Sequence, residues 1–478
     1  MADPEIILTP LGGGREIGAN SSLLRWGGRT ILLDAGLHPT REGYEALPLL
    51  APLEELGALD ALVVTHGHLD HVGALPFLTR EFRPRSVFMT DPTVAVTSRM
   101  LHNTVSVMAL HGYRVYGDPG YYEGHYSHRA VDELTELLRF SSQPFGHWFH
   151  VAGPVRGMFF EAGHVLGAGG IVLTDGRFTL VYPGDICLEP QEIHPGARLP
   201  RLDRPVDTIL LESTYGGDPE AAKVVRRKEV ARFARRARKV LNRGGSVLIP
   251  AFALGRTQEM LTVVTRLIEA GELPRFPIRV SGLGRAMNLV YDEFSHELSP
   301  GPDGFPRLAH GYGILEIYPR GTRWGPPDLD FIQHKVRRLL EGPSLIIATN
   351  GMMKDETPSA HFAEQMLQRR EDAIFFVGYV DRNELGARVL EAVEGDEILF
   401  GLEGRAVRVC CRDIERFYFT AHAHREDLLR VAAHFAARQT VLVHGEPESV
   451  EWMRDNVPGD GEVFAPAVGA TVELSGGG

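Results

Sequence analysis

The stretch Val63-Val64-Thr65-His66-Gly67-His68-Leu69-Asp70-His71 places four potential metal ligands within six residues. The apolar and β-branched run 60–65 predicts a short buried strand, and 72–78 predicts the start of a helix with an apolar face. We therefore expect the ligands on a tight strand-to-helix loop. In an H-x-H pair on an extended segment, both imidazoles project to the same side and can reach one cation. The aspartate and histidine that follow point elsewhere, which suits a second cation close by.

Composition indicates a globular protein rather than a membrane or disulfide-framed one. The chain has 478 residues, of which 44% are hydrophobic and 23% charged, so we expect about two to four domains. No apolar run approaches the roughly 18 residues that span a bilayer, and 1–5 has no basic region that would predict a secretory signal. Three cysteines make no disulfide framework, which favours a cytoplasmic location.

The net charge of −12 bears on nucleic-acid binding. A protein that held nucleic acid mainly by bulk attraction would be basic. Any such binding by this chain must therefore be local, through a groove and bound metal ions. The charge weakly disfavours a nonspecific binder and does not exclude a nuclease.

A repeated pattern extends the first histidine cluster along the chain. A short apolar strand ends in a polar, ligand-type residue, and a glycine-bearing loop follows; this occurs at Asp34, His66, His164, Asp185 and Glu212. Sites are often built from several strand ends because a sheet holds them rigid. Asp34 has two interpretations, a turn-forming aspartate or an acceptor that fixes a metal-bound imidazole.

The beginning of the chain argues against a dinucleotide site. Residues 6–34 predict a strand followed by a β-hairpin with its turn at Gly27-Gly28. The glycine-rich loop 12–18 opens a further strand, whereas a dinucleotide-binding loop opens a helix.

The middle of the chain predicts a separate α/β unit. Buried strands are expected at 246–253, 344–349 and 373–379, with helical segments between them. Strands that alternate with helices favour a parallel sheet. Two more strand ends follow, at Thr420-Ala421-His422-Ala423-His424 and at Val443-His444-Gly445-Glu446.

Residues 222–243 predict a basic helix with an apolar stripe at helical spacing. A solvated amphipathic face is the favoured interpretation of its charges. A surface that follows phosphates is the alternative.

Together these motifs resemble a known family. The stretch Thr65–His71, with Asp34, His164 and Asp185, is similar to the metallo-β-lactamase fold. Three further motifs resemble those of its β-CASP nuclease branch, of the cleavage-and-polyadenylation-specificity-factor and ribonuclease J type: Glu212 in Leu-Glu-Ser-Thr-Tyr-Gly, His422 in Thr-Ala-His-Ala and His444 in Val-Leu-Val-His-Gly-Glu. Pro250–Arg256 and Ala348–Met352 resemble stretches of that branch's inserted domain, and the resemblance runs from about Leu8 to Glu446.

The resemblance implies an α/β fold, a four-layer αββα sandwich with an inserted α/β β-CASP domain. The implied domains are 1–213 and 396–478 for the metallo-β-lactamase part and 214–395 for the insert. It also implies two Zn²⁺ ions. Carried over by motif, the ligands of one zinc are His66, His68 and His164, and those of the other are Asp70, His71 and His444. Asp185 would bridge the two ions.

The implied activity is a zinc-dependent ribonuclease, endo or 5′–3′ exo, that leaves 5′-phosphate products from single-stranded RNA. Catalytic roles fall to His422 as proton donor, to Glu212 as the residue that orients it, and to Asp70 and Asp185 at the metals. Two zinc ions suit phosphodiester hydrolysis because they clamp the attacking and leaving oxygens. His444 favours the RNA branch, since DNA-processing relatives usually carry an apolar residue there.

Three alternatives stay open at the sequence level. The chain would be a single-stranded DNA nuclease of the same fold, a small-molecule metallo-hydrolase, or a scaffold subunit; a large insert disfavours the second, and filled ligand positions disfavour the third. A homodimer is also open. The chain departs from the family pattern at His424, Asn350 and Lys354-Asp355, which bears on substrate preference and rate. Cleavage mode, polarity and the cellular RNA are not encoded in any motif.

Overall fold

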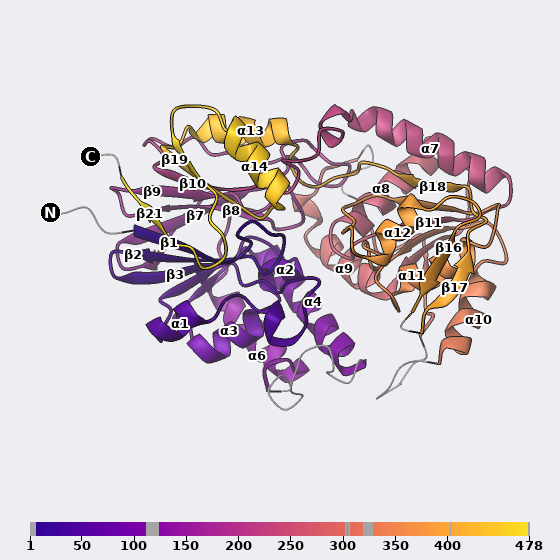
Figure 1. Ribbon diagram of the computed structural model, residues 1–478, viewed down its shortest axis with the longest axis horizontal. Helices are drawn as coiled ribbons and strands as arrows, with labels where there is room; N and C mark the ends of the chain where they lie inside the picture. Colours follow the sequence, from indigo (N-terminus) through magenta and orange to yellow (C-terminus); the bar gives the residue numbers. More distant parts are fainter. Residues whose placement is uncertain are drawn as a thin grey trace. The chain divides into compact units, whose positions relative to one another are not determined.

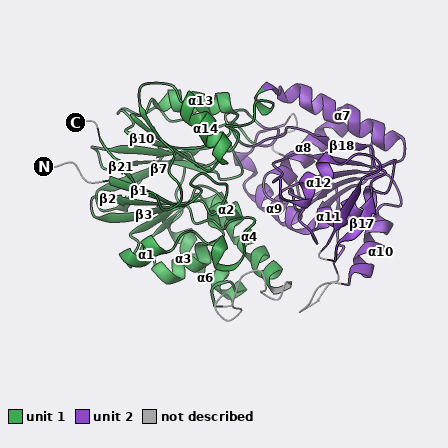
Figure 2. Cartoon of the chain, in the orientation of Figure 1, with its two compact units in different colours: residues 1–190, 194–222, 422–478 green, residues 191–193, 223–421 purple. Residues whose placement is uncertain are grey.

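The computed structural model describes residues 6–110, 124–301, 304, 306–318, 328–401 and 403–476. These fall into two compact units (Figure 2). Unit 1 comprises 1–190, 194–222 and 422–478, and unit 2 comprises 191–193 and 223–421. The sequence-predicted domain bounds describe a different division of the chain and stay a prediction.

The first sheet of unit 1 has the strand order β21-β1-β2-β3-β4-β5. Its strands are β1 (Ile6–Gly12), β2 (Ser21–Trp26), β3 (Arg29–Leu33), β4 (Ala61–Val63), β5 (Val87–Phe88) and β21 (Val472–Leu474). The expected hairpin is confirmed, because β2 pairs antiparallel with β3 around Gly27 and Gly28, which both have positive φ. The strand β4 pairs parallel with β3 and β5, so the chain returns between them through helices.

The second sheet of unit 1 has the order β20-β19-β10-β9-β8-β7-β6. Its strands are β6 (Trp148–Ala152), β7 (Val155–Glu161), β8 (Gly169–Thr174), β9 (Thr179–Tyr182), β10 (Thr208–Glu212), β19 (Gln439–Val443) and β20 (Glu462–Phe464). β10 lies between β9 and β19, parallel to both. The strand β19, from the last part of the chain, therefore lies inside this sheet, between β20 and β10 (Figure 1).

Apolar side chains explain why the two sheets stack. One buried core combines Leu24 and Ile31 of the first sheet with Phe159, Ile171 and Leu180 of the second. Each is less than 3% exposed, and such burial contributes about 1.5–3 kcal/mol per large side chain. The two sheets thus share one apolar layer between their inner faces.

Helices cover both outer faces of this pair of sheets. The first sheet packs against helices that include α3 (Leu75–Phe82), α4 (Asp91–Leu110) and α6 (His128–Phe140). The second packs against α13 (Arg425–Phe435) and α14 (Pro447–Asn456). The layer order is helix, sheet, sheet, helix (Figure 1), which confirms the predicted αββα sandwich.

Unit 2 is built on a sheet of order β13-β12-β14-β11-β15-β18. Its strands are β11 (Val247–Pro250), β12 (Ile278–Ser281), β13 (Gly313–Leu315), β14 (Leu345–Ala348), β15 (Ala373–Phe376) and β18 (Asp413–Arg416). The pairings between neighbouring strands of this sheet are parallel, as the alternation of strands and helices predicts. The helices are α7 (Arg226–Asn242), α8 (Arg256–Glu269), α9 (Gly282–Glu293), α10 (Leu329–Leu339), α11 (Pro358–Met366) and α12 (Leu385–Glu391). A short hairpin, β16 (Glu397–Phe400) with β17 (Arg405–Arg408), completes it.

Among the described residues, no helix combines the length and apolar character needed to cross a bilayer.

Candidate metal centre

Strand ends of unit 1 bring the sequence-predicted ligands together. His66 follows β4, Asp185 follows β9 and His444 follows β19. All seven predicted ligands fall into two neighbouring groups whose donor atoms lie within 4.8 Å of one another: His66, His68, His164 and Asp185, and Asp70, His71 and His444. The parallel neighbours β9, β10 and β19 end at the same sheet edge, which is why residues so far apart in sequence meet.

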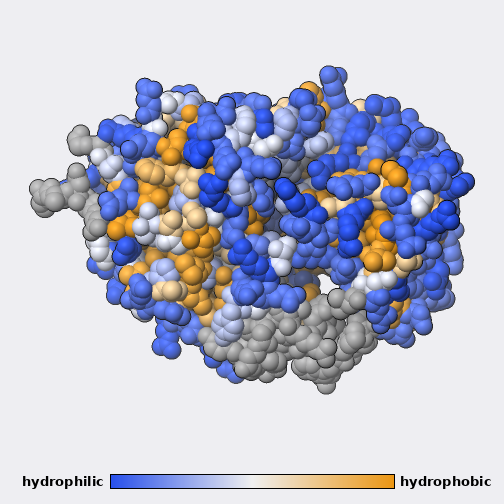
Figure 3. Space-filling view, viewed as in Figure 1, coloured by the Kyte–Doolittle hydropathy of each residue, from blue (hydrophilic) through white to orange (hydrophobic). Residues whose placement is uncertain are grey.

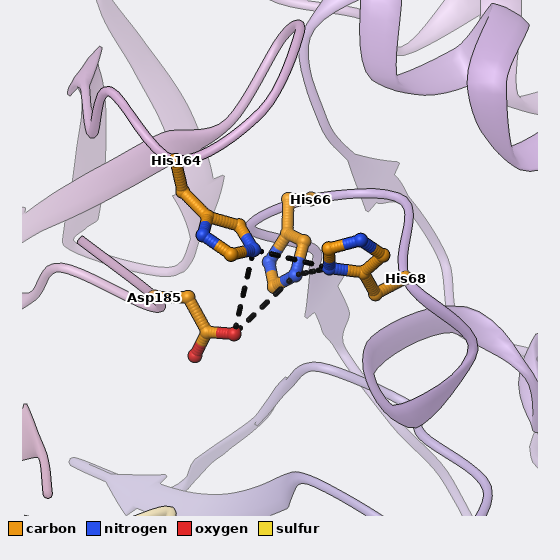
Figure 4. A group of neighbouring side chains, drawn as sticks. All are labelled: His66, His68, His164 and Asp185. Carbon is orange, nitrogen blue, oxygen red and sulfur yellow. Dashed lines mark hydrogen bonds and ion pairs between the residues drawn. The ribbon is translucent and has the colours of Figure 1, made fainter. Parts of the chain in front are cut away.

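The first group is a set of imidazole nitrogens that face one point (Figure 4). His68 Nδ1 lies 3.0 Å from His66 Nε2 and 3.1 Å from His164 Nε2. Asp185 Oδ2 lies 3.6 Å from His66 Nε2 and 3.8 Å from His164 Nε2. Three imidazole nitrogens and one carboxylate oxygen are donors of the kind that bind zinc.

The second group is completed by a residue from the end of the chain. His444 Nε2 lies 3.2 Å from Asp70 Oδ2, and His71 Nε2 lies 3.8 Å from the same oxygen. Asp185 reaches this group too, with Oδ2 3.5 Å from His71 Nε2 and Oδ1 3.3 Å from His444 Nδ1. Asp185 therefore stands between both groups, which suits the bridging role proposed for it.

The prediction that Asp70 and His71 lie on a loop is wrong. Both residues lie in the short helix α2 (Leu69–Val72), because the His68 carbonyl accepts from the His71 and Val72 amides at 2.9 and 3.0 Å and closes a helical turn. A second helix, α3, begins at Leu75.

A buried carboxylate fixes one of the imidazoles. Asp34 Oδ2 accepts from His71 Nδ1 at 2.8 Å and from the Tyr182 hydroxyl at 2.7 Å. Its Oδ1 accepts from the Thr65 amide at 2.7 Å. Because a carboxylate only accepts, the His71 proton sits on Nδ1 and Nε2 is directed to the ligand group. Asp34 holds φ at +61°, a strained value that its fully buried hydrogen bonds maintain.

His422 lies beside the ligands without belonging to either group. Its Nδ1 is 3.1 Å from Glu212 Oε2, and its ring centroid is 4.5 Å from that of His164. Glu212 is held in turn, since its Oε1 accepts from the Ile186 amide at 2.8 Å and its Oε2 accepts from the Thr214 hydroxyl. The His422 side chain is 18% exposed and that of Glu212 is 1% exposed, so of this pair the histidine is the one open to solvent.

Burial and neighbouring charges shift the pKa values of the site residues in different directions. Burial lowers the pKa of His66 well below its usual value and that of His68 to about 4, which leaves both imidazoles neutral as metal ligands must be. Burial alone would raise the pKa of Asp185, yet His444 and His71 hold it well below its usual value. Burial lowers the pKa of His422, but Glu212 and Asp185 outweigh it and raise the pKa.

The residues present fit a metal centre. Asp185 Oδ1 is buried and accepts no hydrogen bond from the described residues, although His444 Nδ1 lies 3.3 Å away. Such an atom is costly unless a cation satisfies it. Imidazole nitrogens and carboxylate oxygens converge on the same points, which is the donor chemistry of transition-metal sites.

Several supporting residues were not foreseen from the sequence. Thr65 and Tyr182 hold Asp34, and Asn20 places Nδ2 3.0 Å from His71 Nε2 and 3.3 Å from Asp70 Oδ2. Tyr182 carries a usable signal, since it ends the strand that delivers Asp185. Asn20 has none, because a lone asparagine after a glycine-rich loop is typical of any turn.

The residues that depart from the family pattern lie outside both ligand groups. Asn350 Oδ1 accepts from the Met352 amide at 2.6 Å, and Lys354 pairs with Glu384 at 3.3 Å. Asp355 accepts from the Gly401 amide at 2.7 Å. These three therefore have structural partners inside unit 2. His424 begins α13, and its buried Nδ1 lacks a hydrogen-bond partner among the described residues.

The αββα fold and the cluster of potential metal ligands at a sheet edge together define the class of protein as a metallo-hydrolase. Three family models match in chain order: the metallo-beta-lactamase superfamily over 14–220, the Beta-Casp domain over 257–389, and the Zn-dependent metallo-hydrolase RNA specificity domain over 406–466. The chain belongs to the metallo-β-lactamase superfamily, in the branch that carries a β-CASP domain.

Curated relatives support this placement. The chain is similar to ribonuclease TTHA0252 of Thermus thermophilus, with 30% identity over 93% of this chain and 94% of that protein. It is 28% identical to endoribonuclease ysh1 of Aspergillus fumigatus over 92% of this chain and 51% of that protein. Integrator complex subunit 11 of Danio rerio is 26% identical over 98% and 74%. The chain thus spans nearly all of the bacterial relative and about half of the fungal one.

One solved structure shares the fold. A protein of unknown function from Enterococcus faecalis matches with a TM-score of 0.57 and 14% identity, over 98% of this chain and 100% of that one.

Proposed function

We propose that this chain is a two-zinc ribonuclease that hydrolyses phosphodiester bonds of single-stranded RNA and leaves 5′-phosphate and 3′-hydroxyl ends. One observation carries the proposal above the others. Two ligand groups share Asp185, and a histidine held by a buried glutamate lies beside them.

The residues that would hold the metals follow from the two groups. His66, His68 and His164 would hold one ion, and Asp70, His71 and His444 would hold the other. Asp185 would contact both, because its two oxygens face both groups. When bound, two zinc ions supply water with a pKa near 7 and neutralise the charge of a phosphodiester.

His422 would supply the proton that the leaving oxygen needs. Glu212 Oε2 accepts from Nδ1, so the exchangeable proton is left on Nε2. The pKa of His422 is raised by Glu212 and Asp185 against the lowering effect of burial, which favours the protonated form near neutral pH. Alkoxides are poor leaving groups, and a positioned acid accelerates such steps by about 10²–10⁴-fold.

RNA is the proposed substrate because of the relatives and of His444. Similar proteins are named ribonuclease and endoribonuclease, and the last matching domain is named for RNA specificity in zinc-dependent metallo-hydrolases. A ligand-competent histidine at position 444 completes the second group, where DNA-processing relatives usually carry an apolar residue.

An end-labelled RNA time course tests the proposal. The purified protein, with zinc content measured, is incubated with a single-stranded RNA with and without chelator, and then with DNA of the same sequence. We expect metal-dependent RNA cleavage to 5′-phosphate products, with the ladder reporting direction and mode. A fully zinc-loaded protein that leaves RNA intact would overturn the proposal. Preferential cleavage of DNA would show that single-stranded DNA, and not RNA, is the substrate.

A further inference from the structure

The helix α7 concentrates positive charge in a chain whose net charge is −12. The basic segment 222–243 carries Lys223, Arg226, Arg227, Lys228, Arg232, Arg235, Arg236, Arg238, Lys239 and Arg243. Its acidic residue Glu229 is buried. In Figure 3, hydrophilic residues predominate along the edge of unit 2 that α7 forms in Figure 1.

One side of α7 uses its arginines to hold unit 2 together. Arg232 contacts Glu229 at 2.7 Å and Glu415 at 3.0 Å, and Arg236 pairs with Glu415 and Asp413. Beyond the helix end, Arg243 pairs with Asp413 at 2.5 Å.

Two other arginines of α7 also have partners within unit 2. Arg226 pairs with the fully buried Glu259, and Arg238 donates to the Glu272 carbonyl. The charges of Arg226, Arg232 and Arg236 are therefore neutralised within unit 2.

The outward face of α7, next to Arg232, carries further cations that make no such contacts. Lys228, Arg235 and Lys239 are exposed, and among the described residues none of the three side chains has an ion pair or hydrogen bond. At 100° per residue the three fall within about 40° of one another on the helix, and they are spaced by about 10 and 6 Å along its axis. We call these three residues the α7 stripe. Arg227, also exposed, flanks it.

We propose that the α7 stripe binds backbone phosphates of single-stranded RNA. The proposal rests on the ribonuclease function proposed above, and it adds a binding surface on unit 2 that is separate from the metal centre. Cations that are not neutralised within the protein are free to release counterions from a polyanion, which is the main source of nonspecific nucleic-acid affinity.

The composition of the stripe favours RNA over a membrane or a protein partner. The apolar side of α7 is already buried in unit 2 through Phe233, Ala237 and Leu241, so it is not available to insert into a lipid surface. Protein interfaces enrich aromatic residues and deplete lysine at their cores, whereas the stripe offers only long cationic side chains. Backbone phosphates match it without requiring base contacts.

The test neutralises the stripe in the full-length protein. The variant K228Q/R235Q/K239Q is compared with R307Q/R337Q/R338Q, which removes the same charge from other exposed positions of unit 2. Binding of a 30-nucleotide single-stranded RNA to metal-free protein is measured at several salt concentrations. We expect the stripe variant to bind at least ten-fold more weakly at low salt, and the slope of log affinity against log salt to fall by about 2, since each phosphate contact on a single strand contributes about 0.7. The control variant should keep the parent slope.

Cleavage assays separate this proposal from the proposed function. Zinc-loaded stripe variant should lose activity on the long RNA but keep the parent rate on bis(p-nitrophenyl) phosphate, a small phosphodiester that cannot reach two sites. Equal slopes for the stripe variant and the parent would overturn the stripe proposal while leaving the ribonuclease proposal intact. If the parent cleaves no RNA but its RNA affinity still depends on the stripe, the ribonuclease proposal fails alone.

Discussion

At the scale of single residues, His422 differs from its histidine neighbours because a glutamate, not the ligand set, holds it. Under the proposed function, replacing His422 by alanine should leave the zinc content unchanged and reduce RNA cleavage by about 10²–10⁴-fold. Zinc content and single-turnover rates measure the two effects. His68→Ala should lose zinc as well, because its Nδ1 lies among the ligand nitrogens. A parent-like rate for His422→Ala would show that the proton comes from elsewhere; the exposed His434 supplies a matched alanine control.

Asp34 has a positioning role, since it contacts the predicted metal ligand His71 through a hydrogen bond. Asp34→Asn replaces one acceptor oxygen with an amide that donates, yet the positions around it are filled by the donors of Thr65, His71 and Tyr182. We expect metal affinity at the His71 group to fall by about 10–100-fold. Competition with a chromogenic chelator measures it. Asp60→Asn is the control, because Asp60 also accepts a backbone amide, from Thr30, and lies outside the ligand groups. Equal affinities in the two variants would count against the role of Asp34.

Asp372 predicts a pH effect that is independent of metals. Burial raises its pKa to about 6 from 3.8, so its contribution to stability is complete below about pH 4 and is lost as pH rises through 6. Between pH 4 and 7 the free energy of unfolding of the parent should therefore fall by about 1–3 kcal/mol relative to that of Asp372→Asn. Urea unfolding across this range measures the shift.

The opposite dependence of stability on pH is expected for Asp175. Burial alone would raise its pKa, but the Phe178 and Arg177 amides lower it, so its contribution is present above the unfolded pKa and is lost as pH falls. Asp175→Asn should destabilise more at pH 7 than at pH 3. A flat pH profile for both asparagine variants would contradict the assigned causes.

Single residues also show which parts of the site could be predicted from the sequence. The ligands could be proposed from the sequence because three histidines and an aspartate within six residues suit metal binding, and the structure brings the seven predicted ligands together as two groups. Tyr182 and Asn20 were not, because hydroxyl and amide side chains serve many purposes, and only distances of 2.7 and 3.0 Å reveal these two.

At the scale of elements, α13 begins without a capping side chain. His424 stands at its N-cap with extended backbone angles and makes no cap hydrogen bond. His424→Asn should supply one and stabilise the protein by about 1 kcal/mol. Urea unfolding of metal-free protein measures this, with His424→Ala as the variant of the same site that cannot cap. If asparagine and alanine give equal stability, the N-cap explanation is wrong.

Elements were predicted best where pattern and burial agree. The strands β11, β14 and β15 are continuous apolar runs, and all their side chains are buried. The start of α2 was missed because its turn depends on carbonyl hydrogen bonds to His71 and Val72, not on periodicity. The favoured interpretation of α7 as a solvated face was incomplete, since Arg232 and Arg236 both pair with Glu415, nearly two hundred residues later in the chain.

At the scale of the whole molecule, both ligand groups belong to unit 1. Removing the metals should therefore destabilise unit 1, by about 2.7 kcal/mol where free metal had been at 100 times its dissociation constant. Unit 2 should be unaffected. Hydrogen exchange with and without chelator measures this, by comparing β9 and β10 with β11 and β14. Equal loss of protection in both units would contradict it.

The position of β19 in the second sheet also has a consequence for a ribosome-bound chain. Unit 2 has all its residues once 421 has been made, whereas β10 must wait for β19 at 439–443 before it gains its second parallel neighbour. His444 emerges immediately after that strand. Domains generally fold as units as they emerge. The insert can therefore fold while the sandwich that encloses it in sequence is still open, and the metal centre is among the last parts of the nascent protein to be assembled.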